Sequence, residues 1–270
     1  MKFVLLFGEF IMDVKTKNGF FAIGNSIAVV LTIIVNALAV LLPINDISTQ
    51  QLSDNIPNLF VPAGITFSIW SVIYILLILF MFYQINEVFV KKKDTAYLGK
   101  IGFYFMLASL ANIVWIFLWH YEQVNLSLLA MIVLFVSLLM IYQRLEIGKG
   151  KVDFKEKMLI HVPISVYIGW ITVATIANVT AVLVVNDAGE LLLGQVTWTI
   201  LAIIIALIIT ILILKNRKDV SFSLVIIWAL LGIAIKRYQV NQSVEIAYAS
   251  FVCIVILIIA ILIGVLKSKK

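Results

Sequence analysis

Long runs of apolar residues alternate with short polar connections along the whole chain. A helix needs about 20 predominantly apolar residues to cross a bilayer, and eight runs approach or exceed that length. We therefore predict eight membrane-spanning helices at residues 20–43, 63–86, 101–120, 124–143, 158–185, 192–214, 220–236 and 246–266. The runs are continuously apolar and do not alternate, which favours helices over the strands of a β-barrel.

The composition supports the same class of protein. Hydrophobic residues make up 63% of the 270 residues and charged residues 13%, against about 45–50% and about 25% in soluble domains. So few polar residues could not cover the surface of a water-soluble fold. The predicted fold class is an all-α integral membrane protein.

The basic residues are unevenly distributed between the connections. Eighteen of the 20 Lys and Arg residues fall on one side of the predicted membrane, and only Lys236 and Arg237 fall on the other. Because basic residues concentrate in cytoplasmic loops, we expect a multi-pass protein of the bacterial cell membrane with both termini in the cytoplasm. The net charge of +6 then reflects topology, and no nucleic acid partner is expected.

Residues 1–19 precede the first predicted span. Their short apolar run is interrupted by Glu9 and has no small-residue cleavage site. We interpret this segment as an amino-terminal cytoplasmic or interfacial segment, not as a signal peptide.

Polar and aromatic residues recur on one helical face in four of the first five spans. Residues three or four apart share a face of a helix. The stripes are Asn25, Val29, Thr32 and Asn36; Thr66, Trp70, Tyr74 and Leu77; Tyr104, Ala108, Asn112, Trp115 and Trp119; and Pro163, Tyr167, Trp170, Ala174 and Asn178.

Two interpretations of these stripes remain open. Asn and Thr can bond across packed helices, and Trp and Tyr gather at membrane interfaces, which suits Trp119 near the end of its span. Alternatively, the stripes line a shared cavity for a flat, largely apolar ligand. Trp70, Trp115 and Trp170 lie well inside their spans, where interfacial residues are not expected. This placement favours the cavity.

Catalytic chemistry finds little support in the sequence. No carboxylate lies near the centre of a span, and no glycine-rich phosphate-binding loop is present. The two histidines, His120 and His161, fall near opposite faces of the predicted membrane, and Cys253 is the single cysteine, so neither a metal site nor a disulfide is expected. We expect a protein that is not an enzyme.

Three motifs carry a resemblance to a known family. The second span begins Pro62-Ala-Gly-Ile-Thr-Phe-Ser-Ile-Trp70-Ser-Val-Ile-Tyr74, the third contains Asn112-Ile-Val-Trp115, and the fifth contains Trp170 with Ala174, Thr175 and Asn178. In this order the motifs resemble the translocator protein/tryptophan-rich sensory protein (TspO/MBR) family. The resemblance covers residues 20–185, which we take as a five-helix bundle, with residues 186–270 as a three-helix membrane extension.

The resemblance implies a bundle that binds tetrapyrroles such as protoporphyrin IX or haem, sterols, and isoquinoline-type drugs. Combined with the stripes, it gives a set of expected ligand-binding residues: Trp70, Tyr74, Asn112, Trp115, Trp119, Tyr167, Trp170 and Asn178. The expected function is a membrane receptor or carrier for such a hydrophobic small molecule, with a tetrapyrrole as ligand and no required cofactor. The expected partners are this ligand, the lipid bilayer and a homodimer mate. The alternative function is a permease-type subunit of an export or stress-resistance system.

The chain departs from the family pattern at two places. The family's Pro-Pro-x-Trp turn reads Pro62-Ala63-Gly64-Ile65, and its aspartate on the fourth helix is replaced in the region of Ala130 and Met131. The missing tryptophan is linked in the family to light-dependent porphyrin breakdown, so that chemistry is not expected.

Overall fold

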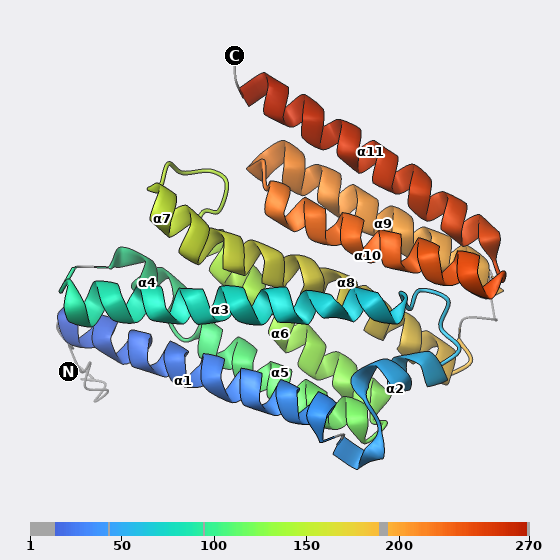
Figure 1. Ribbon diagram of the computed structural model, residues 1–270, viewed down its shortest axis with the longest axis horizontal. Coiled ribbons are helices and arrows are strands. Elements are labelled where there is room, and N and C mark those ends of the chain that lie inside the picture. Colours follow the sequence, from blue (N-terminus) through green and yellow to red (C-terminus); the bar gives the residue numbers. More distant parts are fainter. Residues whose placement is uncertain (1–13, 43, 94, 189–193, 269–270) are drawn as a thin grey trace, which may run out of the picture.

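The computed structural model describes residues 14–42, 44–93, 95–188 and 194–268, and this part of the chain is almost entirely helical (Figure 1). Its long helices are α1 (Val14–Leu41), α3 (Ile69–Ile85), α5 (Tyr104–His120), α6 (Val124–Arg144), α8 (Val162–Val185), α9 (Gly194–Arg217), α10 (Val220–Val240) and α11 (Val244–Ser268). Its short elements are η1 (Ile44–Asp46), α2 (Thr49–Asn55), η2 (Gly64–Ser68), η3 (Asn86–Val90), α4 (Ala96–Ile101), α7 (Phe154–Glu156) and η4 (Lys157–His161).

Each predicted span corresponds to one long helix. Seven helical segments of the described residues are long and apolar enough to cross a membrane, and the eighth apolar helix, Tyr104–His120, has 17 residues. This helix starts later than predicted because Gly102, with φ 54°, separates it from α4. The all-α membrane class is therefore confirmed, and the protein is a multi-pass integral membrane protein.

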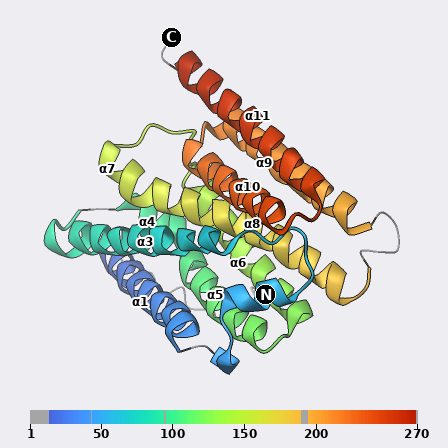
Figure 2. The same ribbon diagram turned by 45° about the vertical axis from the view of Figure 1, so that its right-hand side comes forward.

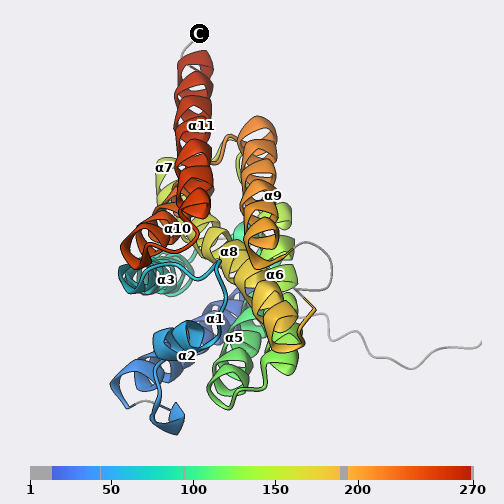
Figure 3. The ribbon, with the colours of Figure 1, turned by 90° about the vertical axis from the view of Figure 1, so that its right-hand side faces the viewer.

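Helix α8 lies at the centre of the molecule (Figure 3). Every residue from Pro163 to Val173 is buried, and a helix that is apolar all round belongs in an interior. Helices α6 and α3 pack against α8 on one side and α10 on another, and α1 and α5 lie beyond α3 and α6. The single tryptophan of α8, Trp170, therefore faces other helices and not lipid.

Helices α9, α10 and α11 form a second group, in which α10 provides most of the contact to the rest and α9 also touches α8 (Figures 1 and 2). A Cβ atom added at Gly169 of α8 would lie 3.2 Å from Val225 of α10. A Cβ atom at Gly232 would lie 1.9 Å from the Thr66 hydroxyl oxygen in η2. Because two glycines allow these approaches, α10 packs directly against the bundle formed by the earlier helices.

Side-chain contacts join the connections at each end of the bundle. At one end, Arg144 donates to the backbone oxygens of Gly99 and Lys100, and Arg217 donates to that of Ile147. At the other end, Asn45 donates to the His120 backbone oxygen. The basic connections that the sequence placed on one side therefore share one end. Which side of a membrane this end faces stays a prediction, and the expected interfacial segment falls mainly on residues 1–13, outside the described part.

The outer faces of the peripheral helices are apolar. Exposed large hydrophobic side chains include Ile27 on α1, Ile75 on α3, Ile205 on α9 and Val252 on α11. In water such surfaces would be unstable, whereas hydrocarbon solvates them without cost. These faces are the ones that contact lipid.

Candidate ligand-binding cavity

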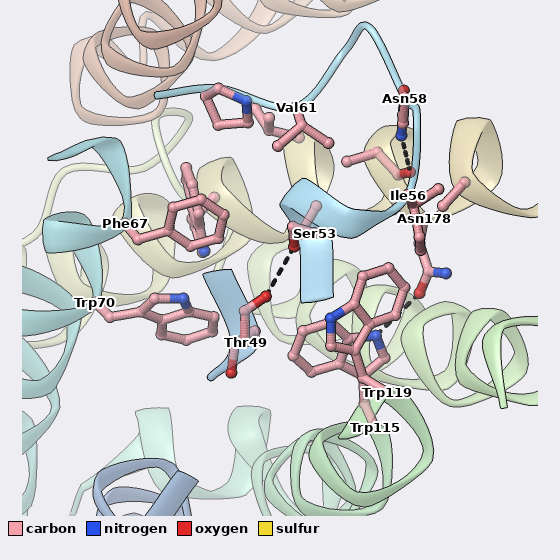
Figure 4. A pocket seen from close by; sticks show the side chains of 16 residues that line it. Thr49, Ser53, Ile56, Asn58, Val61, Phe67, Trp70, Trp115, Trp119 and Asn178 are labelled. Carbon is pink, nitrogen blue, oxygen red and sulfur yellow. Dashed lines mark hydrogen bonds between the residues drawn. The ribbon is translucent and has the colours of Figure 1, made fainter. Parts of the chain in front are cut away.

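A cavity lies between α2, α3, α5 and α8, at the end of the bundle opposite the basic connections (Figure 4). It is lined by Thr49, Ser53, Ile56, Asn58, Val61, Pro62, Phe67, Trp70, Trp115, Trp119, Trp170, Val173, Ala174, Ala177, Asn178 and Ala181. Four of the six tryptophans of the chain belong to this lining. None of the lining residues carries a charge, so the cavity suits an apolar ligand.

The wall formed by α8 is a stripe of one tryptophan, one asparagine and small residues. Trp170, Ala174, Ala177, Asn178 and Ala181 recur at intervals of three and four residues, so they share a face. The three alanines leave the space into which the neighbouring tryptophans project. This wall follows directly from the sequence of the fifth predicted span.

The aromatic side chains form two groups. Trp115 and Trp119 on α5 stack, with centroids 5.6 Å apart and planes 19° apart. Trp170 makes edge-to-face contacts with Trp70 at 6.2 Å and with Phe67 at 6.1 Å. Both geometries are favourable for aromatic pairs, so the packing fixes the orientation of these rings.

Few polar groups reach the cavity, and two of them lack partners. Trp115 Nε1 donates to Asn178 Oδ1 at 2.9 Å, and Asn178 also bonds to Ser127 of α6. The indole N–H groups of Trp119 and Trp170 are buried and have no hydrogen-bond partner in the described structure. Because an unpaired buried donor is costly, these two groups are available to an acceptor on a ligand.

The segment that covers the cavity consists of α2 and residues 56–62. Ser48 caps α2 by accepting from the Gln51 backbone N–H, and the Gln51 side chain accepts from the Ser48 N–H in return. Asn58 anchors the segment to α8 by donating to the Ala177 backbone oxygen and the Thr180 hydroxyl. Polar contacts anchor the edges of the cover, and its side chains Leu52 and Phe60 are buried in the hydrophobic core.

Two further contacts tie α2 to the bundle. Thr49 Oγ1 lies 3.3 Å from His120 Nε2, and His120 Nδ1 lies 2.7 Å from the Ile116 backbone oxygen. Since that oxygen only accepts, Nδ1 carries the proton and Nε2 of the neutral ring accepts from Thr49. Asp54 forms an ion pair with Lys236 of α10. Lys236, one of the two basic residues on this side, therefore has a defined partner in the cover.

The cavity is small in this conformation. Its volume is about 60 Å³, whereas pockets for drug-sized ligands measure about 300–1,000 Å³. A large planar ligand would require the cover to move outward. The aromatic walls belong to long helices, whereas α2 and residues 56–62 are a connection between helices, so an enlarged cavity would need this connection to shift.

Five of the eight predicted site residues line the cavity: Trp70, Trp115, Trp119, Trp170 and Asn178. The other three lie beside it. Tyr74 stacks on Trp70 at 5.6 Å, Tyr167 contacts the edge of Trp70 at 6.3 Å, and Asn112 accepts from Asn36 at 2.7 Å. These three residues position the lining or join helices.

Sequence reasoning missed the cover and two of the small residues below it, Ala177 and Ala181. Thr49, Ser53, Ile56 and Asn58 belong to a connection that the span count treated only as a loop. One signal of α2 was present in the sequence. Ser48 is followed three residues later by Gln51, and this spacing is typical of the start of a helix.

Among known proteins, the chain matches one family model. No curated protein and no solved structure matches the chain. The sequence model of the family described as TSPO-like protein matches residues 22–263. This match extends past the five-helix region through α9, α10 and most of α11. On this match over nearly its whole length, the chain belongs to the TSPO-like family.

Proposed function

We propose that this protein is a membrane receptor or carrier that binds a hydrophobic, planar small molecule in the tryptophan-lined cavity. A porphyrin, haem or sterol-like molecule is the ligand class that we propose. The protein acts without chemistry on the ligand, and it is therefore not an enzyme.

One observation carries this proposal: four tryptophans surround an uncharged cavity, and two of them keep an unpaired N–H group. Indole faces pack well against flat apolar rings. The free N–H groups of Trp119 and Trp170 suit an acceptor at the edge of the ligand, such as a carbonyl or carboxylate oxygen. Both features together favour a flat molecule with a few acceptors over an aliphatic chain.

The chemistry of the cavity also supports binding without reaction. Among the described residues, no group of three His, Cys, Asp or Glu side chains is placed to hold a metal ion. His120, which contacts Thr49 of the lining, is engaged on both ring nitrogens. General acid–base catalysis needs a titratable group within reach of the ligand, and the lining residues supply none.

Titration of the full chain with protoporphyrin IX, followed by tryptophan fluorescence, tests the proposal. Trp115→Ala and Trp170→Ala should weaken binding by about tenfold to a hundredfold, because removal of a buried aromatic contact costs about 1–3 kcal/mol. Trp119→Phe and Trp170→Phe keep a ring and remove only the N–H group, so they should weaken binding by a few-fold.

Trp198→Phe is the matched control, since Trp198 on α9 does not line this cavity and its indole N–H is also unpaired. This variant should bind like the wild type. Circular dichroism must show that all variants remain helical. If both alanine variants stay folded and bind protoporphyrin IX with unchanged affinity, the cavity is not the binding site.

A further inference from the structure

A second, larger cavity lies at the opposite end of the bundle from the tryptophan-lined cavity. It is formed by residues 147–152, by the beginning of α8 with η4, and by the turn between α9 and α10, and its volume is about 700 Å³. Along α8, His161 in this cavity and Asn178 in the first are separated by 17 residues, or about 25 Å of helix. The two cavities are therefore separate sites.

Positive charge dominates the walls of this basic cavity. Lys151, Lys157, Lys218 and Arg217 line it, against one carboxylate, Asp219. The three lysine side chains are exposed, and within the described residues none of them has an ion pair or hydrogen bond. Arg217 donates to the Ile147 backbone oxygen and lies over the Tyr142 ring.

The carboxylate offsets only one of the four positive charges, and its oxygens are engaged elsewhere. Asp219 caps α10, because its Oδ1 accepts from the Phe222 N–H at 3.1 Å, and its Oδ2 accepts from the Tyr142 hydroxyl at 2.9 Å. Both oxygens thus accept hydrogen bonds within the protein. Because one carboxylate faces four basic side chains, the cavity keeps a net positive charge.

His161 provides a second, independent sign of a ligand. Its side chain lines the cavity and is only 7% exposed, yet its Nε2 atom has no hydrogen-bond partner. The nearest carboxylate oxygen, Glu156 Oε1, is 3.9 Å away, beyond hydrogen-bond distance. A buried ring nitrogen without a partner is costly, and a ligand oxygen in the cavity would satisfy it.

The first turn of α10 adds further donors. Val220 and Ser221 begin this helix and line the cavity. The first N–H groups of a helix have no partner within it, and they favour anions. One cavity thus brings together three lysines, Arg217, the Nε2 atom of His161 without a hydrogen-bond partner, and the start of α10. This arrangement suits a phosphate group.

An apolar groove continues from the basic cavity into the membrane region. A neighbouring cavity of about 670 Å³ shares Lys157, Lys218 and Val220 with it and extends between α9 and α11 along Ile211 and Ile261. A phosphate group with a hydrocarbon chain attached fits this pair of cavities, whereas a free phosphate would use only the first. Basic pockets between spanning helices are a known mode of binding anionic lipids.

We propose that the basic cavity binds the phosphate group of an anionic phospholipid, with an acyl chain in the groove between α9 and α11. Lys151, Lys157 and Lys218 hold the charge, and His161 with the first turn of α10 contacts the phosphate oxygens. This site is independent of the ligand proposed for the tryptophan-lined cavity.

Competition against a fluorescently labelled phosphatidylglycerol, on the full chain in a non-ionic detergent, tests this proposal. Unlabelled phosphatidylglycerol should compete at least about tenfold better than phosphatidylcholine with the same acyl chains, because the basic side chains of the site outnumber its one carboxylate. Inorganic phosphate should compete far more weakly. Equal competition by the two lipids would overturn the proposal, and inorganic phosphate competing as well as phosphatidylglycerol would overturn the assignment to a lipid.

Matched variants locate the site. The triple variant Lys151→Gln, Lys157→Gln and Lys218→Gln should lose the preference for phosphatidylglycerol. The control triple variant Lys92→Gln, Lys149→Gln and Lys155→Gln removes the same charge from exposed residues at the same end that line neither cavity, and it should keep the preference. Equal loss in both variants would show a general charge effect and would overturn the site.

A third variant tests the groove. Ala260→Trp places a large side chain in the groove between α9 and α11, at a position that does not line the basic cavity. It should weaken phosphatidylglycerol binding several-fold while inorganic phosphate competes as before. Unchanged lipid affinity in this folded variant would overturn the placement of the acyl chain.

Discussion

Trp115 on α5 donates its indole N–H to Asn178 on α8, and the same Asn178 side chain bonds to Ser127 on α6. All three side chains are buried. One asparagine thus joins three helices directly beside the tryptophan-lined cavity. In a membrane interior, where water cannot replace a lost partner, such bonds fix how helices are oriented.

Loss of this contact should destabilise the bundle measurably. Asn178→Ala leaves the Trp115 N–H without its acceptor, and side-chain hydrogen bonds between membrane helices contribute about 0.6 kcal/mol on average and up to about 1.7 kcal/mol. A double-mutant cycle of Asn178→Ala with Trp115→Phe, measured by unfolding in mixed micelles, should give a coupling energy in this range. Strictly additive effects would show that the bond contributes nothing to stability.

The close approach of α10 to η2 should depend on Gly232. A Cβ atom there would meet the Thr66 side chain at 1.9 Å, and the Gly232 backbone oxygen accepts from the Ala63 N–H. Gly232→Ala should lower stability by about 1–3 kcal/mol through overpacking, measured by thermal unfolding in detergent. Thr66→Ala in the same chain should recover part of this loss.

Gly264→Ala is the control for that substitution. No atom lies within 4 Å of a Cβ added at Gly264 on α11, so this change should leave stability nearly unaffected. A wild-type unfolding temperature for Gly232→Ala would mean that α10 and η2 separate easily.

The ion pair between Asp54 and Lys236 should restrain the cover of the cavity. The pair is partly exposed, so it contributes about 0–1 kcal/mol to stability and more to the mobility of α2. Asp54→Asn should raise both the association and dissociation rates of protoporphyrin IX by about two- to fivefold, measured by stopped-flow fluorescence.

Two variants separate this effect from a general change of charge. Asp46→Asn removes an exposed carboxylate from the same connection and should leave the rates unchanged. Exchange of the two charges, in Asp54→Lys with Lys236→Asp, should restore slow kinetics. Rates that follow net charge alone would argue against a restraint by this pair.

The predicted orientation can be tested in cells. Reporter fusions after Lys93, Lys151 and Lys218 should report a cytoplasmic location, and a fusion within residues 45–58 should report the opposite side, because 18 of the 20 basic residues lie on one side. A reporter at the carboxyl terminus that is active outside the cytoplasm would contradict the orientation.

The amino-acid sequence by itself determined the helices and much of the cavity wall. A run of about 20 apolar residues has few alternatives to a spanning helix, so each predicted span appears as a helix whose ends lie within six residues of the expected bounds. The stripe from Trp170 to Asn178 is equally local, because helical periodicity alone decides which of its residues share a face.

Only the tertiary structure decided which stripe residues reach the cavity and what covers it. Tyr74 shares a helical face with Trp70, but Trp70 stacks on it and takes the place beside the cavity. The cover rests on contacts such as Asn58 to Thr180, 122 residues apart in the chain. The position of α10 likewise depends on Gly232 facing Thr66. Local patterns specify helices and their faces, whereas contacts between distant segments depend on the shape and packing of both surfaces, which no local pattern contains.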